Sequence, residues 1–336
     1  MITIYDIAEK TGYTAPTVSK AINGTGYLNA RTREKILKTA EEMGYQPNMV
    51  ARTLTTKKSN LIGVIYDDCK MKQGFDHPLF GGMLNRFRAQ VEDAGYDIIF
   101  LSRQFRMSYV AHSRYRSVDG VAIINPDDNG ADQLVAIHEA GIPCISTNNY
   151  IPGICTVVTE NEKSGYAGAE YLISMGHRKI AFLAGPVNNF SPAAQERYTG
   201  FCKCLNDHGI VFDKRLFQEC NFWHSKAGYE GFARIYRRTT DFTAVFATDD
   251  LLAFGVMEYA EEHNIRIPDR LSLIGFDNDR VASFCHPRLT TFSQDKVLIA
   301  DLAAETLLQL MVGIPAPEII RVPATLIMRE SVKKIL

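Results

Sequence analysis

From residue 61 onward, short apolar runs alternate with longer stretches in which apolar residues recur every three to four positions. The short runs are typical of buried strands, and the longer stretches have the periodicity of helices packed on a core. The expected strands span residues 61–66, 97–101, 120–124, 144–147, 179–184, 244–248 and 271–276. The expected helices span residues 79–94, 164–175, 192–208, 251–263 and 296–311. This alternation predicts an α/β fold with parallel, doubly wound sheets.

The region from residue 61 to residue 336 is too long for one sheet of ordinary size, so we expect two side-by-side lobes. In open α/β sheets, ligands bind beyond the carboxyl ends of the strands. The pattern therefore predicts a ligand site between the two lobes.

Residues 1–47 have a different pattern, which predicts an all-α head of three short helices. Thr3 and Asp6 have the spacing of a capping box for the first helix, and Gly12 ends that helix. Thr14 can cap a second helix over residues 15–22. Asn29 can cap a third helix, whose inner stripe is expected to be Ile36, Leu37, Ala40 and Met43.

The first two helices and the turn between them have the spacing of a helix-turn-helix, whose second helix enters the major groove of DNA. The residues expected on the outward face of that helix are Ala15, Pro16, Thr17, Ser19 and Lys20. Hydroxyl groups suit phosphate oxygens, and a lysine can reach the guanine edge. On spacing alone, a three-helix bundle that binds no nucleic acid remains the alternative.

Charge points to the same end of the chain. Residues 1–60 hold nine Lys or Arg and five Asp or Glu, a net charge of +4, whereas the whole chain is at −1. A basic head on a mildly acidic body fits a polyanion as the partner of the head alone. Residues 48–60 are polar and basic, and their first part can form two helical turns that we expect to order only on a partner.

Other classes of protein lack support in the sequence. No apolar run approaches the ~20 residues of a membrane helix, and the N-terminus has no secretory-signal pattern, so we expect a cytoplasmic protein. The seven cysteines are scattered, and Cys202 and Cys204 are too close for a zinc-knuckle pair, so we expect reduced thiols, no metal and no cofactor. The motifs GxSxG, Walker A and GxGxxG after a strand are absent, so we expect no enzyme activity.

The head resembles the LacI/GalR family of bacterial transcriptional regulators. The Thr-Val-Ser-Arg/Lys-x-x-Asn run of that family is here Thr17-Val-Ser-Lys-Ala-Ile-Asn23. Residues 40–48 and 51–54 match the family as well. Matching blocks in the core span residues 171–185, 197–201, 247–255, 273–277 and 287–291. The resemblance thus covers essentially the whole chain.

For the head, the resemblance implies DNA contacts in the second helix and in the hinge. The residues that match are Thr14, Ala15, Pro16, Thr17, Ser19, Lys20, Asn23, Arg52 and Leu54. In that family, paired hinge helices push a leucine into the minor groove, and Leu54 is the residue that matches. An apolar wedge can unstack a base step and kink the duplex. The alternative for Leu54 is a packed linker leucine.

For the core, the resemblance implies the fold of a periplasmic sugar-binding protein, with crossings between lobes near residues 157–161, 289–294 and 323–329. The expected domains are a head (1–47), a hinge (48–60) and a core (61–336). The first lobe spans about 61–159 and 291–325, and the second about 160–290 and 326–336.

The effector contacts carried over by this resemblance are Leu79, Phe80, Asn148, Arg197, Trp223, Asp249 and Asp277. Carboxylates accept hydrogen bonds from vicinal hydroxyls, arginine donates to sugar oxygens, and an indole covers the apolar face of a sugar. The set therefore favours a sugar. Each residue taken singly could instead be a surface ion pair or a core aromatic.

The resemblance implies a homodimeric repressor that binds double-stranded operator DNA under the control of a small effector, with no membrane partner. Tetrameric members of the family append a C-terminal heptad helix that is absent here, and the expected dimer seam is residues 79–94 and 251–263. A transport-type sugar-binding protein and a nucleobase or phosphoprotein effector are the alternatives. Three positions depart from the family pattern: Lys20 is commonly Arg, Asn148 usually Asp and Asp249 often Asn.

Overall fold

The computed structural model describes residues 2–46, 58–66, 74–101, 107–126, 130–187 and 191–335. Contacts divide the chain into two compact units, Met1–Asn60 and Leu61–Leu336. The expected hinge residues Arg52 and Leu54 lie outside the described residues. Within those residues, no helix has the length and apolar character needed to cross a membrane.

The head is built from three helices, α1 (Ile4–Thr11), α2 (Ala15–Asn23) and α3 (Ala30–Glu42). Its small core consists of Ile7, Val18, Ala21, Ile36 and Ala40. The capping predictions for the first and third helices are confirmed, since the Thr3 amide donates to Asp6 at 2.7 Å and the Asn29 side chain accepts from the Arg31 amide at 2.9 Å. Thr14 stands at the N-cap of α2 as expected, but its side chain accepts no hydrogen bond from an amide of that helix.

The prediction that Leu37 belongs to the inner stripe of α3 is wrong. Leu37 is 44% exposed, whereas Ile36 and Ala40 are buried and Met43 packs against them. Successive residues of a helix point about 100° apart, so the turn that places Ile36 in the core directs Leu37 off the stripe.

The core unit holds two sheets, each with six strands in the described residues. The first contains β1 (Leu61–Ile65), β2 (Asp97–Phe100), β3 (Gly120–Ile124), β4 (Cys144–Thr147), β5 (Cys155–Thr159) and β11 (Ile319–Val322). Its order is β11-β5-β4-β3-β1-β2, and every pairing is parallel. Helices α5 (Phe80–Asp93) and α12 (Lys296–Met311) cover one face, and α6 (Tyr109–Arg116) and α7 (Ala131–Glu139) cover the other.

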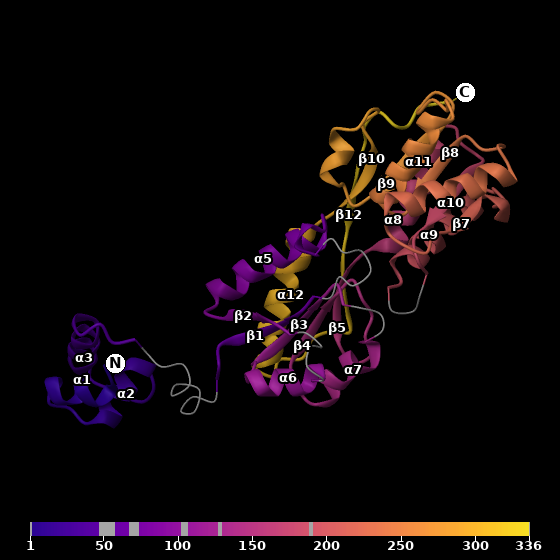
Figure 1. The fold of residues 1–336 in the computed structure, drawn as a ribbon. Coiled ribbons are helices and arrows are strands. Elements are labelled where there is room, and N and C mark those ends of the chain that lie inside the picture. The colour runs from indigo at the N-terminus through magenta and orange to yellow at the C-terminus, as the bar shows by residue number, and fades with distance from the viewer. Residues whose placement is uncertain are drawn as a thin grey trace. The chain divides into compact units, whose positions relative to one another are not determined.

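The second sheet contains β6 (Ile180–Ala184), β7 (Phe217–Glu219), β8 (Ala244–Ala247), β9 (Ser272–Phe276), β10 (Thr290–Gln294) and β12 (Ala324–Ile327). Its order is β12-β10-β9-β8-β6-β7, and only the β10–β12 pairing is antiparallel. Helices α8 (Asn161–Ser174) and α9 (Ala193–Asp207) cover one face, with α10 (Ser225–Arg238) and α11 (Asp250–Glu262) on the other. Short 3-10 turns lie at Gly74–Asp76, Lys214–Leu216 and Arg280–Ser283. Each sheet with its helices is one lobe (Figure 1).

The predicted α/β class, with an all-α head and doubly wound parallel sheets, is confirmed by this topology. In both sheets the strand that comes first along the chain lies between the second and the third. That reversal of strand order is where ligands bind in such folds, outside the carboxyl ends of the strands.

The chain passes between the lobes at three places in the described residues. It leaves the first sheet after Thr159, returns to the first lobe after Gln294, and crosses last at Pro323, between β11 and β12. The expected bounds near residues 290 and 325 are corrected, because β10 and β12 pair within the second sheet. The lobes are therefore 61–159 with 295–322, and 160–294 with 323–335.

Candidate functional site

The first candidate surface is the outer face of α2 in the head. Thr14, Pro16 and Lys20 are exposed and Ala15, Thr17, Ser19 and Asn23 are half-buried, whereas Val18 and Ala21 face the core. The outward residues expected from the sequence therefore share a face. Whether they contact DNA stays a prediction.

Polar contacts order part of this face. The hydroxyls of Thr14 and Thr17 lie 2.9 Å apart, and the Asn23 amide donates to Ser19 Oγ at 3.2 Å. The stem of Lys20 passes beside Gly26, with its Cδ 3.5 Å from where a Cβ at Gly26 would stand. Asn23 therefore orients Ser19, and the turn after α2 supports the stem of Lys20.

In the second lobe, the guanidinium of Arg197 is the centre of the candidate ligand site. It extends from α9, is 3% exposed, and donates to Asn161 Oδ1 at 2.9 Å and to the Thr248 carbonyl. Its Cζ lies 3.4 Å from the centroid of the Phe276 ring, a cation–π arrangement. Burial lowers the pKa of Arg197 to about 10, although the nearby Asp277 and Asp249 oppose that shift.

Two carboxylates follow neighbouring strands of the same sheet. Asp249 comes after β8, is 8% exposed, and accepts from the Leu251 amide at 2.6 Å as the N-cap of α11. Asp277 comes after β9 and accepts a hydrogen bond from the Gln294 side chain. Burial, and then the charge of Asp277, raise the pKa of Asp249 well above its ordinary value. One cation and two acids thus meet at the carboxyl edge of the second sheet.

Trp223 lies at the same edge, half-buried between the two clusters of core residues that cover the second sheet. Its ring packs against Gly185, where a Cβ would stand only 2.3 Å from a ring carbon. The Gly185 amide donates to Thr248 Oγ1 at 2.9 Å, and the carbonyl of Thr248 accepts from Arg197. Gly185 and Thr248 therefore connect the indole of Trp223 to the buried guanidinium of Arg197.

The first lobe contributes a different group of residues. Leu79 is 6% exposed and belongs to the hydrophobic core, and the half-buried Phe80 has its ring centroid 4.6 Å from that of His77. Asn148, directly after β4, has a buried side-chain nitrogen with no hydrogen-bond partner. Leu79 therefore packs in the hydrophobic core of the first lobe, and its contact with a ligand stays a prediction.

Two further polar residues were missed by the sequence analysis. The side-chain nitrogen of Asn125, after β3, and the hydroxyl of Thr147, at the end of β4, are also buried without partners. Both lie at the carboxyl edge of the first sheet, as Asn148 does. The signal that could have found them is a polar side chain at the end of an apolar run, at the place where parallel sheets bind ligands.

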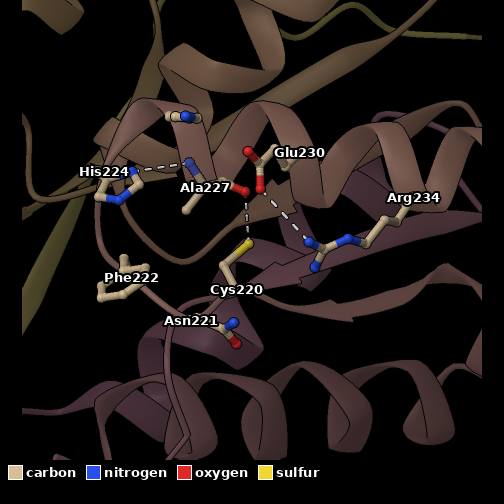
Figure 2. Close-up of a pocket in the computed structure, with 8 residues that line it drawn as sticks. Cys220, Asn221, Phe222, His224, Ala227, Glu230 and Arg234 are labelled. Atoms are coloured by element: carbon tan, nitrogen blue, oxygen red, sulfur yellow. Dashed lines mark hydrogen bonds and ion pairs between the residues drawn. The ribbon is translucent and has the colours of Figure 1, made fainter.

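A surface pocket of about 280 Å³ lies elsewhere, at the start of α10 (Figure 2). Its floor includes Cys220, whose thiol donates to the Ala227 carbonyl at 3.3 Å, and its rim carries the Glu230–Arg234 ion pair at 3.7 Å. None of the expected effector residues lines it. Among the described residues, no cluster of His, Cys, Asp or Glu is arranged to hold a metal ion.

Comparison with known proteins identifies the class. Residues 3–48 match the family described as "Bacterial regulatory proteins, lacI family", and residues 169–332 match the "Periplasmic binding protein-like domain". The chain is 30% identical to the HTH-type transcriptional regulator DegA of Bacillus subtilis (strain 168) over 311 residues, 90% of this chain and 88% of that protein. It is 27% identical to the repressor PurR of Mannheimia succiniciproducens, over all of both chains.

Solved structures agree with this result. The lac repressor dimer bound to operator and the anti-inducer ONPF is 25% identical, with a TM-score of 0.80 over 99% of both chains. The CelR–cellobiose complex, at 24% identity and a TM-score of 0.71 over 98% of this chain and 100% of that one, shares the fold.

A helix-turn-helix head on a two-lobed, periplasmic-binding-protein-like core defines a DNA-binding transcriptional regulator rather than an enzyme. The chain belongs to the LacI family. The resemblance found in the sequence is confirmed.

Proposed function

We propose that this regulator is a cytoplasmic repressor that reads a near-palindromic operator as a homodimer, and that a sugar bound between the lobes of its core controls operator affinity. The observation that carries the sugar assignment is the cluster of buried Arg197 and Asp249 with half-buried Asp277, beside Trp223. Among similar proteins, one solved regulator holds cellobiose and another holds ribose.

The chemistry of both lobes supports a polyhydroxylated ligand. Two carboxyl groups and a guanidinium on one lobe match vicinal hydroxyls, and an indole matches an apolar sugar face. On the other lobe, Asn125, Thr147 and Asn148 hold buried polar atoms without partners. An unpaired buried group costs about 1–3 kcal/mol, and sugar hydroxyls would satisfy these groups. The proposed effector contacts are Leu79, Phe80, Asn148, Arg197, Trp223, Asp249 and Asp277, with Asn125 and Thr147 added.

The proposed DNA contacts are those of α2 and the hinge: Thr14, Ala15, Pro16, Thr17, Ser19, Lys20, Asn23, Arg52 and Leu54. The exposed part of α2 carries hydroxyls and a lysine, which suits phosphates and base edges. The proposed domains are the head (1–47), the hinge (48–60) and the core (61–336). Paired heads match a two-fold symmetric operator.

The test of DNA recognition begins with selection of binding sites from random duplexes by the full chain. On the selected site, Lys20→Ala should weaken binding by ~1–3 kcal/mol and relax preference at one base pair per half-site. Lys38→Ala, an exposed lysine of α3, removes the same charge from the head and is the matched control. If both variants changed affinity and base preference equally, or if no sequence were enriched, the assignment of α2 as the reading helix would be wrong.

The test of the effector site uses the single tryptophan. In a panel of mono- and disaccharides that includes ribose and cellobiose, a sugar that raises the melting temperature should also change the emission of Trp223 saturably. Asp277→Asn should abolish both responses, whereas Asp269→Asn, at an exposed ion pair with Lys333, should leave them intact. If a sugar bound both variants equally well, the effector site would not include Asp277 and would have to lie elsewhere in the protein.

A further inference from the structure

A compact polar cluster joins the two lobes of the core. Arg321, on β11 of the first lobe, donates two hydrogen bonds to the carboxylate of Glu196 on α9 of the second lobe, at 2.9 and 3.1 Å. The Tyr150 hydroxyl, from the first lobe, donates to the same carboxylate at 2.9 Å and accepts from Arg321 at 2.8 Å. We call Tyr150, Glu196 and Arg321 the interlobe cluster.

The Arg321–Glu196 pair differs from the other ion pairs that the structure describes, each of which lies within one lobe. Its side chains are 37% and 18% exposed, so solvent screens it only in part. Burial by itself would raise the pKa of Glu196, but Arg321 and Tyr150 outweigh burial and hold that pKa below its ordinary value. The carboxylate is therefore charged at neutral pH, and paired charged hydrogen bonds of this kind are strong and directional.

The cluster continues into the second lobe through Asn161, at the start of α8. The Asn161 amide nitrogen donates to Glu196 at 3.3 Å, and its oxygen accepts from the Arg197 guanidinium at 2.9 Å. Arg197 in turn donates to the carbonyl of Thr248, whose hydroxyl accepts from the amide of Gly185, the residue under the Trp223 ring. An unbroken line of contacts thus runs from Arg321 in the first lobe to Trp223 in the second.

We propose that Glu196 is a positioning residue that holds the two lobes in their mutual arrangement and ties that arrangement to the guanidinium of Arg197. Both oxygens of its carboxylate accept hydrogen bonds from the first lobe, and Oε2 also accepts from the side-chain amide of Asn161, which orients Arg197. A ligand that competes with Asn161 for the Arg197 Nε–H reorients the Asn161 side chain, and this changes the hydrogen bond that Asn161 donates to Glu196 and with it the pairing of Glu196 with Arg321. By thermodynamic linkage, a change in lobe arrangement alters the affinity of the Arg197 guanidinium for that ligand by the same coupling free energy. Only the assignment of Arg197 to the effector rests on the proposed function.

The first test measures how easily acrylamide quenches Trp223 emission in the native full chain. Glu196→Gln keeps the shape of the side chain but removes its charge, and Arg321→Met removes the partner. If the cluster holds the lobes, either change shifts the population toward separated lobes and raises the quenching constant about twofold. Tyr150→Phe, which removes one hydroxyl, should raise it less. Circular dichroism verifies that each variant is folded.

Arg288→Met is the matched control. Arg288 also donates two side-chain hydrogen bonds to one carboxylate, that of Glu330, at 2.7 and 3.0 Å, but both residues belong to the second lobe. Its loss should leave the quenching of Trp223 unchanged. Wild-type quenching in Glu196→Gln and Arg321→Met, or an equal rise in Arg288→Met, would show that the cluster stabilises the fold without holding the lobes.

The second test concerns the tie to Arg197 and uses a double-mutant cycle between Arg321→Met and Arg197→Lys, again read by quenching, because these two residues share no direct contact and are joined through Glu196 and Asn161. Residues in one network give non-additive effects, and independent residues give additive ones. Non-additivity supports the tie, and additivity overturns it. None of these measurements needs DNA or a sugar, so their failure is distinguishable from the failure of the proposed function.

Discussion

Asp249 is an expected effector residue whose surroundings raise its pKa. It is buried next to Asp277, and both effects favour its protonated form. A protonated carboxyl group offers one donor and one acceptor, as a side-chain amide does. This accounts for an aspartate at a position where the family often has asparagine, and it predicts a pH-dependent stability.

The change that tests this is Asp249→Asn. Because the folded-state pKa is raised, the folded chain keeps a proton that the unfolded chain releases above about pH 4. Wild-type stability then falls as pH rises toward the folded-state pKa, by at most about 1.4 kcal/mol per pH unit for this group. Asparagine has no proton to lose, so the melting temperature of the variant relative to that of the wild type should rise with pH above pH 5, up to the folded-state pKa of Asp249.

Thermal melts of both chains across that range check this prediction. Asp250 has a raised pKa for a similar reason, burial, and it is present in both chains, so its contribution cancels in the difference. A difference in melting temperature that is constant with pH would mean that Asp249 is ionised in the folded chain.

At the residue scale, the sequence located the second-lobe part of the candidate site better than the first-lobe part. Arg197, Asp249 and Asp277 came from motif blocks and do lie together. Asn125 and Thr147 stand outside those blocks, and what marks them is burial without a partner, which depends on packing by distant segments. Leu79 matched by position, but its burial in the core follows from the packing of α5 on β1.

At the scale of elements, the head depends on very few buried side chains. Ile36 of α3 is fully buried, and its neighbour Leu37 is 44% exposed. Ile36→Ala should cost ~2–5 kcal/mol, enough to unfold a domain of this size. Leu37→Ala, the matched control, should change the stability little.

Limited proteolysis and DNA binding check this prediction. In Ile36→Ala, residues 2–46 should be cleaved rapidly and DNA binding should be lost, while the core keeps its melting temperature because its own contacts are intact. Equal protease resistance in the two variants would mean that the three helices draw their stability from elsewhere.

The elements found from the sequence were those with long apolar patterns. The seven expected strands correspond to β1, β2, β3, β4, β6, β8 and β9, with ends that differ by at most one residue. The resemblance implied a crossing near residues 289–294, and the chain does cross after Gln294, but β10 itself was not predicted as a strand. Its sequence, TTFSQ, is mostly polar. It is a strand because β9 and β12 flank it and bury Thr290 and Thr291. That environment is created by the fold and cannot be seen in a short window of sequence.

At the scale of the whole molecule, α11 indicates where a second copy could pack. Both sides of this helix carry apolar residues: Leu252 and Val256 are buried in the second lobe, and Leu251, Phe254 and Met257 are half-exposed. An apolar stripe that remains half-exposed in one chain is typical of a subunit interface. This supports the expected seam at residues 251–263.

Phe254→Asp should therefore weaken self-association, because a carboxylate would have to be desolvated in the seam. Light scattering over a concentration series should show the wild type as a dimer and the variant shifting to monomer. Val211→Asp, the same kind of change at an exposed apolar position outside the seam, should leave the dimer intact. If Phe254→Asp stayed dimeric at every concentration at which the wild type does, the seam would have to lie elsewhere.

The last crossing of the chain has a consequence for how this regulator is made in the cell. β11 pairs with β5 so that Ile319 stands opposite Thr156, and α12 covers a face of the same sheet. A ribosome therefore releases residues 61–159 long before their final strand and helix exist, with an apolar face and a strand edge open to chaperones or to aggregation. A premature stop after Gln294 would leave the head encoded but the first lobe unfinished. Such an allele should yield a rapidly degraded polypeptide rather than a repressor that has lost only its response to effector.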